Sequence, residues 1–398
     1  MKILIADKLS AKAVCELEDL GAQVIVKPDL TADDLPSAIA GVEILIVRST
    51  KVKAATIEAA DSLSLIIRAG SGVNTIDLEC ASGKGIYVAN CPGKNTEAVA
   101  EIAIGLLIAA DRRIANATAD MRAGTWNKKE YGKANGLKGR TLGIIGVGNI
   151  GKAVIKRAMG LEMNVIAFDP ILTEEMADEL EIGRCDNAQQ VAQQADAISI
   201  HLPANSKTAH FIGKNFLMCM KDQAIFINTS RGEVVDTKAL KDAIKQKRLR
   251  VGLDVYEDEP AATEKIFSDR ELAEMITGTP HIGASTNQAA EAVADEVVRI
   301  VQAYKDTGSP INAVNIQKKS SAQCSLTVRH YNRVGVLAGA LDQLRNEGVN
   351  IEKMENIIFA GQIAAHCRLK LDSKPSSELV SQIANDNNII QVNLNQLN

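Results

Sequence analysis

The fold is decided by one stretch of the chain, Leu142-Gly143-Ile144-Ile145-Gly146-Val147-Gly148-Asn149-Ile150-Gly151. An apolar strand runs directly into a turn with the spacing G-x-G-x-x-G, and residues 152–159 continue as a helix. In this arrangement Gly146 permits a tight turn, Gly148 lets the backbone approach a bound diphosphate, and Gly151 lets helix and strand pack closely. The stretch therefore predicts the dinucleotide-binding turn of a parallel α/β sheet.

The residues around this turn indicate which dinucleotide it binds. The amide groups of Asn149 and Ile150 lie at the start of a helix, where they and the helix dipole favour a diphosphate. Asp169 follows eighteen residues after Gly151, at the end of the next strand, where it can accept hydrogen bonds from the ribose hydroxyls. Its carboxylate would repel a 2′-phosphate, so we expect NAD rather than NADP as the cofactor. The alternative is a glycine-rich turn that packs without a ligand.

Composition limits the classes of protein that remain. The chain has 398 residues, of which 46% are hydrophobic, and a formal net charge of -4. This length suggests two or three domains, and the charge argues against a nucleic-acid partner or a membrane surface. The longest apolar run, Ile102–Ala110, is too short to span a bilayer. Seven scattered cysteines without C-x-x-C spacing support neither disulfides nor a metal site. We expect a soluble, cytoplasmic protein.

Around the glycine-rich turn, short apolar strands alternate with helices in two successive sets, which is typical of parallel sheets covered on both faces. Two long helices, at about 96–117 and 287–306, connect the sets. We therefore expect an α/β fold with two doubly wound lobes and a cleft between them, a common place for a ligand. The expected substrate-binding lobe is flavodoxin-like and combines residues 1–95 with 285–316. The expected NAD-binding lobe is a Rossmann domain of residues 96–284, and a linker follows at 317–323.

The last part of the chain has a different pattern. Residues 324–398 contain the expected elements in the order strand, helix, strand, strand, helix, strand. The expected strands are 325–330, 350–358, 362–371 and 389–394, and the helices are 334–346 and 376–385. This order predicts an appended ferredoxin-like βαββαβ domain.

Three polar residues follow strands of the second set. Arg231 follows the segment 226–230, Glu259 follows the strand that ends near Val255, and His281 follows Pro280. An arginine can hold a carboxylate through its forked donors, and a histidine beside a glutamate can exchange a hydroxyl proton. Together they predict the oxidation of a hydroxy acid. Taken singly, each has a plain alternative as a loop residue, a solvated acid or a loop hydrogen-bonder.

Three segments that contain these residues, 228–236, 252–260 and 279–286, resemble signatures of the D-isomer-specific 2-hydroxyacid dehydrogenase family. The resemblance covers essentially residues 1–315. It implies Arg231 as the substrate anchor, Glu259 and His281 as the acid–base pair, and NAD as the hydride carrier. It also implies cofactor contacts from further residues, namely Leu202, Thr229, Ser230, Asp254, Gly283 and Ala284.

The segments 47–51 and 67–74 resemble those of family members that oxidise 3-phosphoglycerate to 3-phosphohydroxypyruvate. The resemblance implies that a set of residues binds this substrate and its phosphate, namely Arg48, Ser49, Arg68, Ser71, Gly72 and Asn95. The two arginines have an alternative as ordinary surface or ion-pair residues. Near Trp126, either Lys128 or Lys129 would reach a neighbouring subunit's phosphate site.

The segments 330–337 and 348–351 resemble an ACT domain, in particular a serine-binding one. The resemblance implies that His330, Asn332 and Asn350 bind L-serine as an effector across a subunit contact, in a homo-oligomer that is a dimer or a tetramer. Val334 stands where proline is common, which could loosen the first turn of the helix. The alternative is a domain that only joins subunits.

Two rival functions remain open at this point. One is another reductase of the same family, acting on hydroxypyruvate, glyoxylate or 2-oxoglutarate. The other is a non-catalytic, NAD-sensing regulator, although the complete set of Arg231, Glu259 and His281 argues against it.

Overall fold

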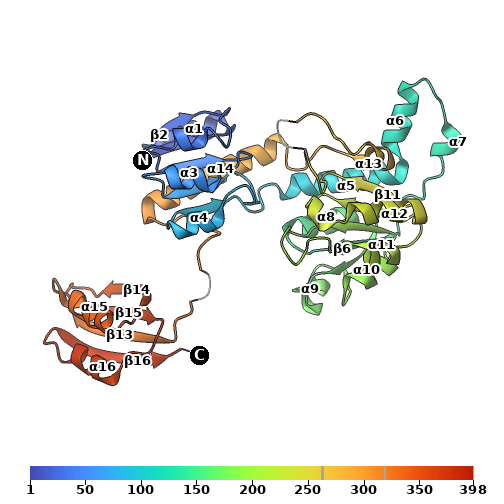
Figure 1. The fold of residues 1–398 in the computed structure, drawn as a ribbon. Coiled ribbons are helices and arrows are strands. Elements are labelled where there is room, and N and C mark those ends of the chain that lie inside the picture. Colours follow the sequence, from blue (N-terminus) through green and yellow to red (C-terminus); the bar gives the residue numbers. More distant parts are fainter. Residues whose placement is uncertain (261–263, 318–319, 398) are drawn as a thin grey trace. The chain divides into compact units, whose positions relative to one another are not determined.

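A computed structural model describes residues 1–260, 264–317 and 320–397. The chain divides into two compact units, residues 1–315 and 316–398, and each is described here by itself (Figure 1). Residues 318 and 319 of the predicted linker lie outside the described part. Among the described residues, no helix is both long enough and apolar enough to cross a membrane.

The first sheet of the larger unit has five parallel strands in the order β2-β1-β3-β4-β5, which is the flavodoxin-like order. Its strands are β1 (Lys2–Ile5), β2 (Gln23–Val26), β3 (Ile44–Val47), β4 (Leu65–Arg68) and β5 (Tyr87–Asn90). The accompanying helices are α1 (Ala11–Asp19), α2 (Leu35–Ala38), α3 (Ala54–Ala59), α4 (Leu78–Gly83) and α14 (Asn287–Thr307). β3 is buried along its whole length, as a strand covered on both faces must be.

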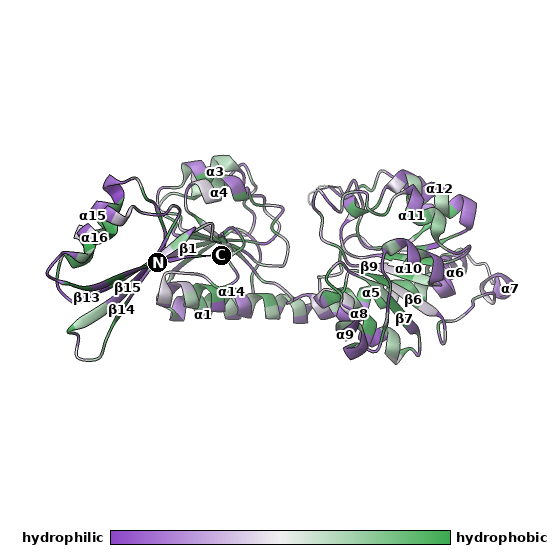
Figure 2. Ribbon diagram, turned by 90° about the horizontal axis from the view of Figure 1, so that it is seen from below, coloured by the Kyte–Doolittle hydropathy of each residue, from purple (hydrophilic) through white to green (hydrophobic). Residues whose placement is uncertain are grey.

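Helix α14 follows the second sheet in the sequence but packs on the first sheet. Its residues Val297, Ile300 and Val301 are buried against Ile3, Ile44 and their neighbours. The helix carries hydrophobic and hydrophilic bands along its length (Figure 2), as expected for a helix with one face on a core. The lobe around the first sheet is therefore built from two separate parts of the chain, since its strands come from residues 2–90 and α14 from residues 287–307.

The second sheet has seven parallel strands in the order β12-β11-β10-β9-β6-β7-β8. The glycine-rich turn follows β6, at which the strand order reverses, so this is the dinucleotide-binding order. The strands are β6 (Thr141–Ile145), β7 (Asn164–Phe168), β8 (Gly183–Arg184), β9 (Ala197–Ile200), β10 (Ile225–Asn228), β11 (Arg250–Leu253) and β12 (Thr277–Gly278). The helical elements are α5 (Thr96–Arg112), α6 (Ile114–Arg122), α7 (Lys128–Tyr131), α8 (Asn149–Gly160), α9 (Glu174–Glu179), α10 (Ala188–Gln194), α11 (Lys214–Cys219), η1 (Gly232–Val234), α12 (Thr237–Lys247) and α13 (Arg270–Met275).

The single helix predicted at about 96–117 is wrong, because the chain breaks it at Arg113. This residue is in the left-handed region with a φ of 52°, and it separates α5 from α6. Its guanidinium is 2.6 Å from a carboxylate oxygen of Glu130 and 5.0 Å from the centroid of the Tyr131 ring. These contacts with α7 stabilise the turn at Arg113, where the sequence has no glycine or proline that would predict a break. Lys128 and Lys129 are exposed on α7.

The smaller unit is the predicted βαββαβ sandwich. Its antiparallel sheet has the order β14-β15-β13-β16, with buried Leu326, Val328 and Leu369 facing the two helices. The elements are β13 (Cys324–Tyr331), α15 (Val336–Asn346), β14 (Ile351–Ile358), β15 (Ala364–Leu371), α16 (Ser377–Ala384) and β16 (Ile389–Gln396). Helix α15 begins two residues later than predicted, after Gly335 with a φ of 85°, and Val334 before it is fully exposed.

Candidate functional site

A cleft of about 1050 Å³ in the larger unit gathers side chains from both sheets. Most of them follow the carboxyl ends of strands, where ligands of open α/β sheets bind. Of the residues predicted for substrate, catalysis and cofactor, the cleft is lined by Arg48, Ser49, Arg68, Asn95, Arg231, Glu259, His281 and Ala284. Residues up to 236 positions apart in the sequence, Arg48 and Ala284, therefore meet in one place.

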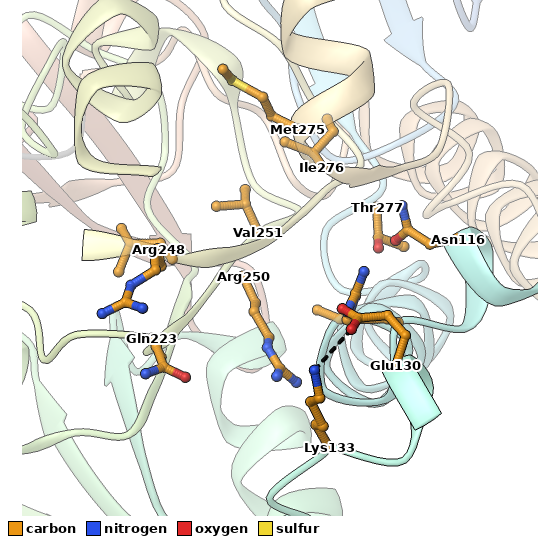
Figure 3. Close-up of a pocket in the computed structure, with 13 residues that line it drawn as sticks. Asn116, Glu130, Lys133, Gln223, Arg248, Arg250, Val251, Met275, Ile276 and Thr277 are labelled. Carbon is orange, nitrogen blue, oxygen red and sulfur yellow. Dashed lines mark hydrogen bonds and ion pairs between the residues drawn. The ribbon is translucent and has the colours of Figure 1, made fainter. Parts of the chain in front are cut away.

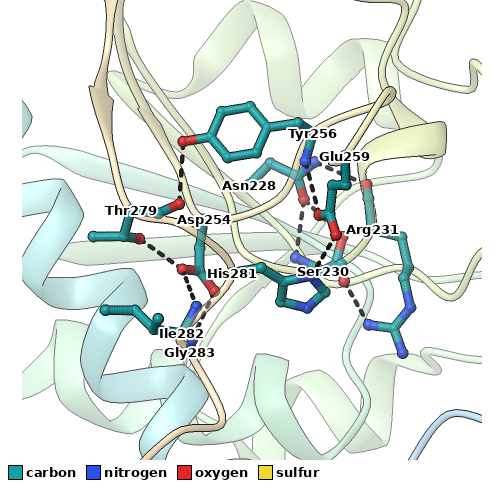
Figure 4. A network of polar contacts seen from close by, with 10 residues as sticks. All are labelled: Asn228, Ser230, Arg231, Asp254, Tyr256, Glu259, Thr279, His281, Ile282 and Gly283. Carbon is teal, nitrogen blue, oxygen red and sulfur yellow. Dashed lines mark hydrogen bonds and ion pairs between the residues drawn. The ribbon is translucent and has the colours of Figure 1, made fainter. Parts of the chain in front are cut away.

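His281 and Glu259 form a direct pair in this cleft (Figure 4). Nδ1 of His281 is 2.7 Å from Oε2 of Glu259, and Oε1 of Glu259 accepts the backbone N–H of Tyr256 at 3.1 Å. The hydrogen bond to Glu259 raises the pKa of His281, against the opposing effect of burial. Burial alone would raise the pKa of Glu259, but the hydrogen bond and charge of His281 hold it below its ordinary value. The pair therefore favours an imidazolium beside a carboxylate.

The turn that carries His281 is held by Asp254, whose side chain is buried. His281 has a φ of 52°, which is uncommon for a residue other than glycine. The Asp254 carboxylate accepts the Thr279 hydroxyl at 2.6 Å and the backbone N–H groups of Ile282 and Gly283 at 2.8 Å each (Figure 4). The Gly283 N–H is thus occupied within the protein. The predicted cofactor contacts of Asp254 and Gly283 stay predictions.

Arg231 enters the cleft from the loop after β10. Its Nη1 donates to the carbonyl oxygen of Ser230 at 2.6 Å, and its own carbonyl accepts from the Asn228 side chain at 2.9 Å. A Cβ placed on Gly72 would lie only 2.7 Å from Nη2 of Arg231. The guanidinium therefore rests against the backbone of the first sheet's loop, and the absence of a side chain at Gly72 leaves room for it.

The loop after β3 is organised by a residue that the sequence did not single out. Oδ2 of Asp7 accepts three consecutive backbone N–H groups, those of Arg48, Ser49 and Thr50, at 2.7, 3.1 and 3.0 Å. One carboxylate thus fixes the turn that presents Arg48 and Ser49 to the cleft. Only the position of Asp7, two residues after the end of β1, could have indicated this role, since β1 and β3 are neighbours in the sheet.

Arg68 has a buried side-chain nitrogen, Nε, that lacks a hydrogen-bond partner among the described residues. Burial, followed by the charges of Arg231 and Arg48, lowers the pKa of Arg68. Within the described residues, none of these three arginines forms an ion pair with a carboxylate. The cleft therefore holds three arginines that have no carboxylate partner among the described residues.

The side chains of Ser71 and Asn95 are hydrogen-bonded to each other. The Ser71 hydroxyl is 2.7 Å from Oδ1 of Asn95, and only Asn95 of the two lines the cleft. The Asn90 side chain donates to the carbonyl oxygen of Ser71, which also holds the loop after β4 in place. Ser71 therefore orients Asn95, and its own substrate contact stays a prediction.

The glycine-rich turn has the shape that a dinucleotide needs. Gly146 has a φ of 96°, and a Cβ there would lie 2.5 Å from the carbonyl oxygen of His201. A Cβ on Gly151 would lie 2.1 Å from the carbonyl oxygen of Gly146, whereas one on Gly148 would meet no atom of a described residue within 4 Å. Two glycines thus serve close packing, and the third leaves open space above the N-terminus of α8, which begins at Asn149.

The surroundings of this turn also fit NAD. One carboxylate oxygen of Asp169 accepts the Val147 N–H at 2.8 Å, so the acid lies directly beside the turn. Thr229 is buried, and its hydroxyl oxygen has no hydrogen-bond partner among the described residues. Leu202 lies against Gly146. Asn149 and Ile150 in the first turn of α8 would hold the diphosphate, and Asp169 the ribose.

Comparison with known proteins agrees with this geometry. The family model for the D-isomer specific 2-hydroxyacid dehydrogenase, NAD binding domain, matches residues 104–283. A D-3-phosphoglycerate dehydrogenase of Methanocaldococcus jannaschii is 36% identical over 370 residues, covering 92% of this chain and 68% of that protein. A hydroxypyruvate reductase of Thermotoga maritima is 38% identical over 77% of this chain and 98% of its own length. The chain belongs to the D-isomer-specific 2-hydroxyacid dehydrogenase family.

A solved structure supports the same assignment for this dehydrogenase. The NAD⁺-bound 3-phosphoglycerate dehydrogenase of Entamoeba histolytica has a TM-score of 0.66 and 28% identity, covering 79% of this chain and 99% of that one. The predicted enzyme class, fold and cofactor, NAD, are confirmed. The chain spans 56% to 63% of the length of other D-3-phosphoglycerate dehydrogenases that it matches.

A second cavity of the dehydrogenase, of about 460 Å³, lies at the amino ends of β11 and β12 (Figure 3). Three of its five charged lining residues pair with each other. Glu130 is 2.6 Å from Arg113 and 2.9 Å from Lys133, and Arg250 donates to the carbonyl oxygen of Asp111. The predicted catalytic residues Arg231, Glu259 and His281 line the larger cavity and not this one.

The three predicted effector residues of the smaller unit do not meet within one chain. His330 pairs with Ala365 in the sheet, whereas Ile351, next to Asn350, pairs with Leu371 six residues farther along β15. At ~3.3 Å per residue, this places them roughly 20 Å apart. His330 is buried, and Asn332 donates to the carbonyl of Gln362 at 3.0 Å near the same end of the sheet.

Proposed function

We propose that this dehydrogenase oxidises 3-phosphoglycerate to 3-phosphohydroxypyruvate with NAD, as a D-3-phosphoglycerate dehydrogenase that supplies L-serine synthesis. In this proposal, residues 1–95 and 285–316 bind the substrate and residues 96–284 bind NAD. The observation that carries it is the set of three arginines in one cleft, without a carboxylate partner among the described residues. A phosphate and a carboxylate on one small substrate would neutralise such a set.

Each arginine has a place in this scheme. Arg231 lies near the acid–base pair, and it would hold the substrate carboxylate and polarise the reacting oxygen. Arg48 and Arg68 come from the opposite wall, and they would hold the phosphate. Ser49, Ser71, Gly72 and Asn95 complete this wall as predicted contributors.

The proton of the hydroxyl would pass to His281. Its Nδ1 is bonded to Glu259, so Nε2 is the nitrogen left to accept the proton as the O–H bond breaks. Bound NAD supplies the acceptor for the hydride that leaves C2. Glu259 then stabilises the imidazolium, and in the reverse direction His281 returns the proton to the carbonyl oxygen.

L-serine regulation belongs to the same proposal. His330 and Asn332 of one subunit, with Asn350 of a second copy, would bind serine at a contact between smaller units. The separation of these residues within one chain supports a homo-oligomer, as a dimer or a tetramer. A cytoplasmic location and the absence of membrane and nucleic-acid partners stay predictions.

The T. maritima relative favours a second candidate, the reduction of hydroxypyruvate. One assay separates the two functions, namely NADH oxidation with phosphohydroxypyruvate, hydroxypyruvate, glyoxylate and 2-oxoglutarate side by side. We expect kcat/KM to be highest for phosphohydroxypyruvate. An equal or higher value for a substrate without phosphate would reject the proposed substrate, and no oxidation with any of them would support the regulator.

A further inference from the structure

His210 and Glu257 form a second histidine–glutamate pair, and Glu257 lies two positions before Glu259 in the sequence. Nε2 of His210 contacts Oε1 of Glu257. The other carboxylate oxygen, Oε2, accepts the backbone N–H of Thr237 at 3.1 Å. Glu257 thus ties the loop after β11 both to the segment after β9 and to the first residue of α12.

The same pair also touches the segment that carries Arg231. The backbone N–H of His210 donates to the carbonyl oxygen of Glu233 at 2.9 Å, and Ile212 forms a bridge with Val235. Gly232 packs so closely under Tyr256 that a Cβ would lie 1.8 Å from the Tyr256 carbonyl oxygen. The loops of Arg231 and Glu259 are therefore held against each other at this point.

The backbone transmits this restraint directly to Glu259. Tyr256, the neighbour of Glu257, donates its backbone N–H to Oε1 of Glu259, and the other oxygen of Glu259 meets His281. Burial would raise the pKa of Glu257, but hydrogen bonds from Thr237 and His210 keep it below its ordinary value. An ionised Glu257 is thus built into the loop, although it makes no contact with His281.

We propose that His210 and Glu257 are positioning residues, which fix the loop of residues 254–260 so that Glu259 reaches His281. This inference rests on the proposed acid–base role of His281, and it adds two residues that the sequence did not indicate. A structural role alone would change stability. A positioning role changes the proton affinity of His281 and the turnover of bound substrate.

The test compares His210→Ala and Glu257→Gln with a conservative variant, His210→Gln, which keeps a donor near the position of Nε2. Glu271→Gln is the matched control, because Glu271 lies on α13, pairs with Lys241 and Lys245, and lines neither of the two cavities. Two experiments are carried out on each variant. Steady-state kinetics give kcat and KM for phosphohydroxypyruvate with NADH, and NMR with ¹³C-labelled histidine follows the titration of the His281 ring. Thermal melting confirms that each variant is folded.

We expect His210→Ala and Glu257→Gln to lower kcat by about 10-fold or more, up to ~100-fold, with a smaller change in KM. In both variants the NMR titration of His281 should move to lower pH, since Glu259 supports the imidazolium less well. The charged groups that face His281 are Glu259, Asp254 and Arg231, and none of them is removed. His210→Gln should restore both kcat and the titration, and Glu271→Gln should leave both unchanged.

His210→Ala is decisive because it keeps the negative charge of Glu257. If this variant turns over and titrates like the unaltered protein, the positioning role is rejected. An effect of Glu271→Gln equal to that of Glu257→Gln would reduce the result to a loss of charge and would also reject the positioning role. The NMR titration needs no turnover, so an unaltered protein without activity on phosphohydroxypyruvate would reject the proposed substrate while leaving this test intact.

Discussion

His281 and Glu259 lie 22 positions apart in the sequence, yet Nδ1 of the imidazole is 2.7 Å from Oε2 of the carboxylate. This contact leaves Nε2 as the ring nitrogen available to the substrate. It also couples the chemistry to pH, because the glutamate raises the pKa of His281 above its ordinary value. The direction of the reaction decides whether that shift helps or hinders turnover.

Replacing Glu259 with Gln should move the pH profile of both directions toward acid. Reduction of the keto acid needs protonated His281, so its kcat/KM falls as pH rises through the raised pKa of His281. Without the carboxylate, the pKa of His281 drops and this fall begins at lower pH. The variant should also lose about 100-fold in kcat near neutral pH. The measurement is kcat/KM for NADH-dependent reduction across a pH series.

The oxidation reaction provides the internal control for this prediction. Oxidation needs neutral His281, so its rise with pH should shift in the same direction, toward lower pH, in Glu259→Gln. Opposite shifts in the two directions, or unchanged profiles in both, would show that another group controls the proton transfer.

Replacing Arg68 with Gln should select against phosphorylated substrate. Arg68 has a buried Nε without a partner among the described residues, so a phosphate would gain a strong ion pair there. We expect kcat/KM for phosphohydroxypyruvate to fall about 30-fold or more, equal to about 2 kcal/mol. The value for hydroxypyruvate should change far less. Steady-state assays with the two substrates measure the ratio.

Lys53→Gln serves as the control for Arg68→Gln. Lys53 belongs to the same lobe, but its charge is paired with Asp33 at 2.8 Å. It should leave the ratio of the two kcat/KM values unchanged. Equal losses on both substrates in Arg68→Gln would assign the arginine to the shared carboxylate rather than to the phosphate.

Alanine substitutions in the glycine-rich turn should separate binding from folding. A Cβ on Gly148 meets no atom within 4 Å in the described part of the chain. Gly148→Ala should therefore melt like the unaltered protein but bind NADH about tenfold more weakly, a loss of about 1.4 kcal/mol. A Cβ on Gly151 would clash with the Gly146 carbonyl, so Gly151→Ala should lower stability by about 1–3 kcal/mol. Fluorescence titration with NADH and thermal melting measure the two effects.

Gly160→Ala is the control for this pair, since it lies at the other end of α8 and also has open space around it. It should change neither the melting temperature nor NADH binding by much. Tight NADH binding in Gly148→Ala would mean that the diphosphate does not approach the backbone at this turn.

The parts of the structure that the sequence predicts are those with local or repeated signals. Apolar runs indicate the two parallel sheets, because a strand that is covered on both faces is apolar along its whole length, as β3 is. The two-residue strands β8 and β12 have too few residues to show any pattern. The glycine spacing predicts the turn after β6, and the motif residues Arg231, Glu259 and His281 do meet in one cleft.

The missed features depend on contacts between distant segments. Asp7 is an ordinary acid in the sequence, and its role appears only when β1 and β3 pair and bring Arg48 and its neighbours to its carboxylate. The break at Arg113 depends on Glu130 and Tyr131 of another helix. His210 and Glu257 show the same limit, since 47 positions separate two side chains that touch.

The smaller unit leads to a prediction about two copies of the chain. Since His330 and Asn350 lie at opposite ends of one sheet, a serine site that uses both must combine two subunits. A twofold contact then contains two equivalent sites, each with His330 from one copy and Asn350 from the other. His330→Ala and Asn350→Ala homo-oligomers should therefore both fail to bind serine. In a hybrid of the two variants, one site of each contact carries both substitutions, while the other is intact.

Isothermal calorimetry on a purified hybrid, with one variant tagged, should recover about half of the serine sites of the unaltered protein, with the original affinity. The separate homo-oligomers of each variant, mixed without subunit exchange, are the control and should show no binding. If the hybrid also fails to bind, or if either variant alone still binds serine, the site does not combine His330 of one copy with Asn350 of the other. If the unaltered protein binds no serine at millimolar concentration, the effector itself is wrong, and the smaller unit serves only to join subunits.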